Sequence, residues 1–240
     1  MNFASETKVK DIALANPEAR KILEDAGVDY CCGGEKSLHD ACLHTDVSTA
    51  ETLRRLHENT KHVSSDQENW KSANLNSLTQ HIREKHHQYV RESIPRIQNK
   101  LEKVMAKHGP NHPEIADIQR FFSEIGREMI MHMQKEEQIL FPYIDALERS
   151  VNTHSSLERP FFQTVVNPVQ AMMKDHDSAG ELLRQIRKAS GEYTAPADAC
   201  TTYKALYQEL REFEADLHQH VHLENNILFP RAVEMEGAVV

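Results

Sequence analysis

The sequence predicts an all-α protein, in which a small helical domain precedes an antiparallel four-helix bundle. Apolar residues after Leu75 recur at the three-four spacing of amphipathic helices. Clusters of Gly, Pro, Asn and Ser divide that region into four long segments. The first 58 residues carry shorter helical signals of their own. Because four helices with short connections pack against their neighbours, the long segments should form a bundle.

The composition supports this expectation and limits the classes of binding partner. The 240 residues are 39% hydrophobic and 27% charged, with only 8 Gly and 9 Pro, as in ordinary helical proteins. The formal charge is -9 and no dense Lys/Arg stripe is present, so neither nucleic acid nor a membrane is expected as a partner. We find no secretory signal and no apolar run of about 20 residues, and expect a cytoplasmic protein with reduced cysteines.

Residues 1–58 are expected to form the small domain. Capping and breaking residues predict three helical stretches, one through Lys8 to Asp25 with a break at Pro17, one beginning at the N-cap Ser37, and one after Asp46. Residues 59–73 are polar and lack apolar periodicity, which is typical of a linker.

The bundle is expected to span residues 74–240. Its four helices are predicted at 75–107, 113–148, 161–190 and 197–236. The second and fourth helices contain the same pattern, H-x-x-x-E-x-x-I-L-F-P, 88 positions apart, which indicates a duplicated helix pair. In both copies the preceding residues are apolar at intervals of three and four, and the His and the Glu occupy the next positions of the same series. The predicted core positions therefore include His132, Glu136, His220 and Glu224.

The first and third helices each add one histidine to this core. From His176 the positions at +3, +7 and +10 are apolar, and the same is true from His87. From His86 they are mostly polar, so we expect His87 and His176 to face inward and His86 to face outward. Helical geometry assigns three further neighbours of these residues to the surface, Glu137, His218 and His222.

Four imidazoles and two carboxylates in an apolar seam predict a metal site. Buried carboxylates lose several kcal/mol of hydration unless a partner neutralises them. A His and a Glu four residues apart share one helix face, so two such pairs with two single histidines can hold two ions with each Glu as a bridge. A single H-x-x-x-E would more often be a surface pair, but the duplication favours a site. The predicted ligands are His87, His132, Glu136, His176, His220 and Glu224.

The donor types favour iron, although manganese and zinc also fit. Glu128 and Asp216 lie four residues before His132 and His220. They could accept hydrogen bonds from the far imidazole nitrogens, line a path for cations, or form a solvated flank.

Cys31 and Cys32 are adjacent and are followed by Gly33-Gly34. Such a pair can be a redox-active thiol pair, whose disulfide would be strained, or two small buried residues at a turn. A nearby helix N-terminus would lower the thiol pKa. Cys42 and Cys200 are expected to be plain structural residues.

The chain resembles the iron-sulfur cluster repair proteins known as RIC, which are hemerythrin-like di-iron proteins with a small ScdA-type N-terminal domain. The resemblance rests on DYCCGG (29–34), HMQKEEQILFP, the HDSAGELL segment at His176, and LENNILFP. It implies the same six iron ligands, a two-cysteine motif at Cys31 and Cys32, and an acidic position near the metals at Glu128. Asp175 stands where a Glu is expected in the family.

The resemblance implies repair of clusters damaged by nitric oxide or oxidants, by donation of iron from a carboxylate-bridged pair with or without an oxo or hydroxo bridge. The implied partners are iron-sulfur proteins or the scaffold on which clusters are assembled, with nitric oxide or oxygen as small ligands. The thiols would contact a partner or supply electrons. Three alternatives stay open: a di-iron nitric oxide or peroxide reductase, a sensor or carrier of oxygen or nitric oxide, and, more distantly, a dinuclear hydrolase. The sequence also leaves open a homodimer and the client proteins.

Overall fold

The computed structural model describes residues 3–43, 45, 47–59 and 70–238. Within these ranges the regular elements are helices, apart from one isolated antiparallel bridge between Lys8 and Ser37. The chain divides into two compact units, Met1–Ala73 with Val221–Ile227, and Asn74–His220 with Leu228–Val240. Most of the linker predicted at 59–73 falls outside the described residues.

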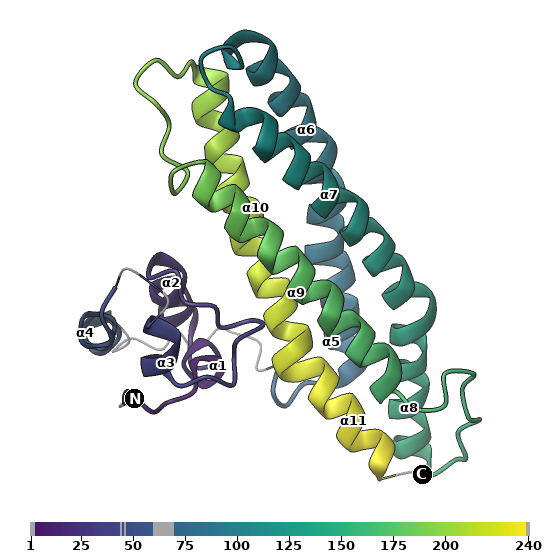
Figure 1. Cartoon of the computed structure of the whole chain (residues 1–240). Coiled ribbons are helices and arrows are strands. Elements are labelled where there is room, and N and C mark those ends of the chain that lie inside the picture. The colour runs from purple at the N-terminus through teal and green to yellow at the C-terminus, as the bar shows by residue number, and fades with distance from the viewer. Residues whose placement is uncertain (1–2, 44, 46, 60–69, 239–240) are drawn as a thin grey trace. The chain divides into compact units, whose positions relative to one another are not determined.

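The N-terminal part of the first unit contains four short helices, labelled in Figure 1: α1 (Val9–Ala13), α2 (Pro17–Asp25), α3 (Leu38–Cys42) and α4 (Thr49–Asn59). The predicted signals act as expected. Pro17 begins α2 behind the N-cap Asn16, whose side chain accepts a hydrogen bond from Ala19 N, and Ser37 caps α3 by accepting one from Asp40 N. The helices bury a small core of fully enclosed side chains, among them Val9, Ile12, Leu23, Leu38 and Leu56.

The second unit contains most of the four-helix bundle, and the prediction of an all-α fold is confirmed. The first long helix is α5 (Leu75–His81), η1 (Ile82–His87) and α6 (Gln88–His108). The second is α7 (Glu114–Lys135), η2 (Glu136–Leu140) and α8 (Phe141–Thr153). The third is α9 (Val166–Ala189), and the fourth is α10 (Thr201–Leu223), η3 (Glu224–Leu228) and α11 (Phe229–Gly237). Among the described residues, no helix is both long enough and apolar enough to cross a membrane.

The helix ends differ from the prediction by a few residues. The second helix continues to Thr153, where His154 adopts the left-handed conformation (φ 51°) and ends it. The third begins at Val166 and not at 161, because Gln163 has φ 72° and cannot belong to a right-handed helix. The predicted apolar stripes lie in the core: Ile115, Ile118 and Phe122 are fully buried, and the Phe122 ring meets Phe213 edge-on at 5.2 Å.

Three of the long helices contain one π-helical turn each, η1, η2 and η3, which the sequence pattern did not predict. In a π turn each N–H bonds the carbonyl five residues back, so the turn is wider than an α turn and shifts the residues that follow it. η2 and η3 are each followed by a proline at the second position of the next α segment, Pro142 and Pro230. Since a proline ring clashes with the carbonyl four residues back, a wider turn before it relieves that clash.

The duplication of the helix pair is visible at the helix ends. Glu148, at the end of the second helix, accepts hydrogen bonds from Leu75 N (2.6 Å) and Asn76 N (2.9 Å) at the start of the first. Glu236, 88 positions later, accepts bonds from Val165 N at 2.9 and 3.1 Å, at the start of α9. Each glutamate thus satisfies backbone donors that a helix N-terminus leaves free, and its negative charge suits the positive end of the helix dipole.

Candidate metal centre

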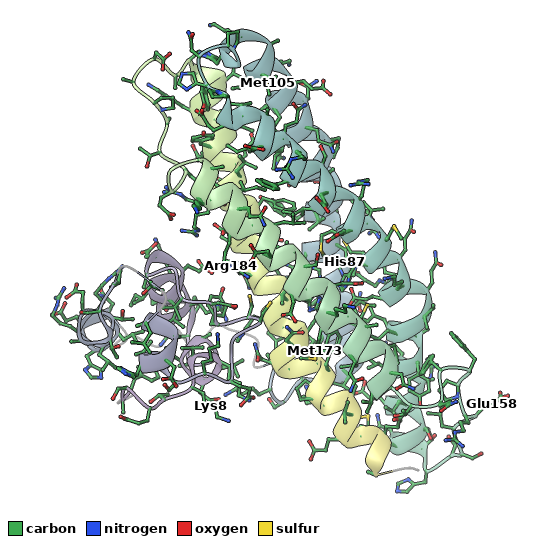
Figure 2. The ribbon with its side chains drawn as sticks, in the orientation of Figure 1. Lys8, His87, Met105, Glu158, Met173 and Arg184 are labelled. Carbon is green, nitrogen blue, oxygen red and sulfur yellow. The ribbon has the colours of Figure 1, made fainter. Side chains whose placement is uncertain are left out.

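The six predicted ligands come from all four long helices. His87 ends η1 and lies within the bundle (Figure 2), while His132 lies in α7, His176 in α9 and His220 in α10. Glu136 and Glu224 are the first residues of the π turns η2 and η3. His176 is 1% exposed and the other five side chains are fully buried. The structure therefore brings together polar groups that are far apart in the sequence and withdraws them from water.

The six side chains form two groups that share both carboxylates. One ligand atom from each of His87, Glu136, His220 and Glu224 lies within 4.8 Å of the others. The same is true of the group formed by His132, Glu136, His176 and Glu224. Each imidazole pair therefore combines the single histidine of one helix pair with the repeat histidine of the other, a pairing that the sequence left undetermined.

The distances fit two ions. His87 Nε2 lies 3.2 Å from His220 Nε2, and His132 Nε2 lies 3.0 Å from His176 Nε2. Two nitrogens bound at right angles to one ion, each about 2.1 Å from it, are about 3.0 Å apart. Glu136 Oε2 lies 3.4 Å from His87 Nε2 and 3.2 Å from His132 Nε2, so this one oxygen is near both imidazole pairs.

The donor set also fits metal ions electrically. Two carboxylates with no exposed surface need positive charge close by, because burial of an uncompensated carboxylate costs several kcal/mol. Imidazole and carboxylate donors without a thiolate suit iron or manganese. The residues present are thus compatible with a pair of such ions.

Two of the imidazoles have carboxylate neighbours on their far side. His87 Nδ1 lies 2.7 Å from Glu137 Oε1, and Arg91 donates to the other oxygen of Glu137 at 2.8 Å. Burial acts to raise the pKa of Glu137, but His87 and Arg91 hold it below the ordinary value. Glu137 was predicted to lie on the surface. Its side chain is 26% exposed, so Glu137 lies partly at the surface while one of its oxygens contacts the buried His87 ring.

Asp175 is the corresponding neighbour of His132. Its Oδ2 lies 3.5 Å from His132 Nδ1 and 2.9 Å from Lys135 Nζ. The contact with His132, opposed by burial and helped by Lys135, lowers the pKa of Asp175 to about 2. A carboxylate on the far nitrogen fixes the imidazole tautomer so that its Nε2 lone pair faces inward.

Glu128 and Asp216, the two acids suggested as neighbours of the ligands, make other contacts. Glu128 accepts a hydrogen bond from Ser178 Oγ at 3.0 Å, and Asp216 Oδ1 lies 3.0 Å from His86 Nδ1. His86 was predicted to face outward, but it is fully buried and stacks on His220 with ring centroids 5.7 Å apart. The prediction was wrong because it assumed α geometry through His86, which lies inside η1.

His222 was also predicted at the surface and is fully buried. It belongs to the segment Val221–Ile227 of the first unit, where its ring meets Tyr30 edge-on at 5.3 Å. Burial lowers the pKa of His222 to about 3, so the ring is neutral at physiological pH. His218 is partly exposed.

The two adjacent cysteines are free thiols whose sulfur atoms lie 3.8 Å apart. Asp29 Oδ1 accepts hydrogen bonds from the backbone N–H groups of Cys31 (3.1 Å) and Cys32 (2.9 Å) and from the Cys31 thiol (3.3 Å). Cys31 is buried and Cys32 is partly exposed. The neighbouring Cys32 thiol, followed by burial and Asp29, raises the pKa of Cys31 well above its ordinary value, contrary to the expected lowering.

Comparisons with known proteins bear on both parts of the chain. Residues 78–232 match the hemerythrin HHE cation binding domain, and residues 5–60 match ScdA_N, described as a domain of unknown function. A probable iron-sulfur cluster repair protein of Haemophilus influenzae is 33% identical over 97% of this chain and 99% of its own length. The iron-sulfur cluster repair protein YtfE of Escherichia coli O81 is 35% identical (94% and 96%), and ScdA of Staphylococcus epidermidis is 29% identical (95% and 99%).

Proposed function

Since the chain belongs to the hemerythrin HHE cation-binding family, we propose that it is a di-iron protein that repairs iron-sulfur clusters damaged by oxidants and nitric oxide. One observation carries the proposal: two buried glutamates, Glu136 and Glu224, are shared by two close imidazole pairs. The repair function follows from the names of relatives that match nearly the whole chain. Its partners would be damaged iron-sulfur proteins or the scaffold that rebuilds their clusters.

In this proposal His87 and His220 would hold one iron, His132 and His176 would hold the other, and Glu136 and Glu224 would supply carboxylate oxygens to both. A bound ferrous pair supplies redox chemistry toward nitric oxide or oxygen and a store of iron for cluster rebuilding. The protein contributes the orientation of the imidazoles and the exclusion of water. Glu137 and Asp175 would accept hydrogen bonds from the Nδ1–H groups of His87 and His132, which keeps the Nε2 atom of each ring available as a ligand.

We further propose that the iron held by His132 and His176 is the one donated. Asp175 lies 3.5 Å from His132, and the Lys135 side chain that also contacts it is 46% exposed. Glu137 by contrast lies 2.7 Å from His87. A longer contact to a carboxylate that is shared with an exposed lysine orients an imidazole less firmly, so His132 can turn away from its ion at lower cost.

The cysteine pair is proposed to contact the partner protein or to supply electrons. Oxidation of Cys31 and Cys32 to a disulfide would pass two electrons to an oxidised iron pair or a damaged cluster and release two protons to solvent. Cys32 is the partly exposed member and the one that a partner can reach, since Cys31 is buried and its pKa is raised.

The experiment that tests this function uses a [4Fe–4S] enzyme inactivated by nitric oxide. We expect the iron-loaded protein to restore its activity, and the His132→Ala variant to restore little. Full repair by a variant that no longer binds iron would contradict iron donation. Steady consumption of nitric oxide or peroxide with an electron donor, without a cluster protein present, would instead support a reductase.

A further inference from the structure

A second group of potential ligands lies at one end of the bundle, away from the helix positions that carry the six buried ligands. His108 ends α6, His112 lies in the turn before α7, and Asp198 lies in the loop between α9 and α10. Figure 1 shows this turn and this loop at the same end of the bundle, and Met105, one helical turn before His108, is labelled there in Figure 2. We call His108, His112, Asp198 and the neighbouring Cys200 the end cluster.

The side chains of the end cluster converge. One ligand atom from each of His108, His112 and Asp198 lies within 4.8 Å of the others. His112 Nε2 is 3.1 Å from both carboxylate oxygens of Asp198, and its Nδ1 is 3.0 Å from Glu114 Oε1. Two imidazoles and a carboxylate from a helix end, a turn and a loop thus lie close enough to bind the same ion.

His108 gives an independent sign of a ligand. Its side chain is 8% exposed, and within the part of the chain that the structure describes its buried Nε2 has no hydrogen-bond partner. Its ring packs near Tyr203, with centroids 5.3 Å apart, and near His112, at 6.0 Å. A buried nitrogen without a partner destabilises the folded state, and such a group in a native protein calls for a specific cause such as an ion.

Cys200 adds a thiol beside these groups, directly before α10. The backbone N–H of Tyr203, followed by the His108 imidazole, lowers the pKa of Cys200 to about 7. Its position beside the His108 imidazole places a soft sulfur donor next to the two imidazoles and the carboxylate.

We propose that His108, His112 and Asp198 bind one divalent transition-metal ion of the zinc class, with Cys200 as the fourth ligand. Imidazole, carboxylate and thiolate donors in a set of four suit tetrahedral zinc, whereas magnesium and calcium prefer oxygen donors only. The ion would join the α6–α7 turn to the α9–α10 loop, which the contact between His112 and Asp198 already brings together. It would be separate from the iron pair, whose donor set includes no thiolate.

The test uses the full-length, iron-loaded protein, titrated with zinc in competition with a chromophoric chelator. We expect one zinc per chain in addition to the iron, with the iron content unchanged and the melting temperature raised by zinc. Asp198→Asn and His112→Gln should weaken zinc binding at least about tenfold. Asp117→Asn is the matched control, because it removes an exposed carboxylate that pairs with Arg120 near the same end of the bundle.

Cobalt tests the fourth ligand, because a thiolate bound to cobalt gives an intense charge-transfer band in the near ultraviolet. We expect this band in the wild type and its loss in Cys200→Ser. A band equally strong in Cys200→Ser would remove Cys200 from the site.

Three results would overturn the proposal. They are no zinc uptake by the iron-loaded protein, uptake matched by loss of iron, and equal zinc affinity in Asp198→Asn and Asp117→Asn. The competing explanation is a plain ion pair, since Asp198, opposed by burial and helped by Glu114, raises the pKa of His112. An ion pair would stabilise the fold below the unfolded pKa of His112 and lose effect as pH rises through the folded pKa, and zinc would not change the melting temperature.

Discussion

The two helix pairs of the bundle are copies of one another on the inside and differ on the outside. Both contain the H-x-x-x-E-x-x-I-L-F-P pattern, a π turn that begins at the Glu, and a glutamate that binds the start of the partner helix. The first long helix, which begins the first pair, also has a π turn, η1. Its counterpart in the second pair, α9, is an α-helix from Val166 to Ala189. The carboxylates behind the imidazoles differ too, since Glu137 comes from η2 and Asp175 from α9.

This comparison shows that duplicated candidate ligands can have different carboxylate neighbours, at 2.7 Å behind His87 and at 3.5 Å behind His132. The repeat determines which residues face the centre, because core positions follow helical periodicity. The support behind each ligand depends on side chains that the repeat does not contain, and their contacts measure 2.7 Å in one half and 3.5 Å in the other. The predictions below test how far the two halves are equivalent.

The largest effect is expected from Glu136→Gln, because Glu136 belongs to both ligand groups. The substitution keeps the side-chain volume and removes the charge, so we expect loss of iron from both halves, by about 100-fold or more in affinity. The metal-free variant should melt at the same temperature as the metal-free wild type or higher, because a buried charge has been removed. Two irons per chain in this variant would show that Glu136 is not a bridge.

His132→Ala should affect one half only. We expect one iron per chain to be lost and the other, held by His87 and His220, to remain. Metal analysis after desalting measures this, and His87→Ala provides the reciprocal variant. Loss of both irons from His132→Ala alone would mean that the halves bind cooperatively and would break the comparison.

The outer carboxylates should give smaller and unequal effects. Glu137→Gln is expected to reduce iron affinity about 10-fold to 100-fold, within the range known for such partners, and Asp175→Asn by less. Iron release to a chelator would report both. A larger loss with Asp175→Asn would contradict the assignment of the weakly held half.

The capping glutamates should change stability without changing iron content. Glu148→Gln removes a charged acceptor from Leu75 N and Asn76 N and should cost about 1–2 kcal/mol in the free energy of unfolding. Chemical denaturation measures this cost. It is the matched control for Glu136→Gln, because both substitutions remove a buried carboxylate. Iron loss in Glu148→Gln would show that charge removal disturbs the centre indirectly.

The smallest effect concerns acid stability. Burial acts to raise the pKa of Glu236, but Thr164, Tyr143 and Val165 N hold it below the ordinary value. Glu236 therefore stabilises the fold above the unfolded pKa of glutamate, and this contribution is lost as pH falls through the folded pKa. Glu236→Gln should narrow the difference in melting temperature between neutral and acidic pH. An unchanged difference would exclude this contribution.

The sequence predicted the helices and the inward-facing residues because periodicity and repetition both report on the core. Ile115, Ile118 and Phe122 lead to His132 at helical spacing, and the second copy repeats the pattern. The position of His86 was mispredicted because it lies in a π turn, which changes the direction of side chains without a clear signal in composition.

Contacts between helices and loops lay beyond prediction for another reason. The partner of His132 depends on which residue of α9 lies beside it, and a single sequence does not determine that. His108, His112 and Asp198 come from a helix end, a turn and a loop, where no periodicity links them. Cys200 was expected to be a plain structural residue, and its lowered pKa depends on the backbone N–H groups at the start of α10 and on His108.

The central claim is a carboxylate-bridged pair of iron ions between the two helix pairs. Metal analysis with a Mössbauer spectrum of the anaerobically purified protein tests it most directly. We predict two irons per chain, with spectra that show a coupled pair with nitrogen and oxygen ligands. One iron per chain, uncoupled irons, or zinc in place of iron would contradict the account.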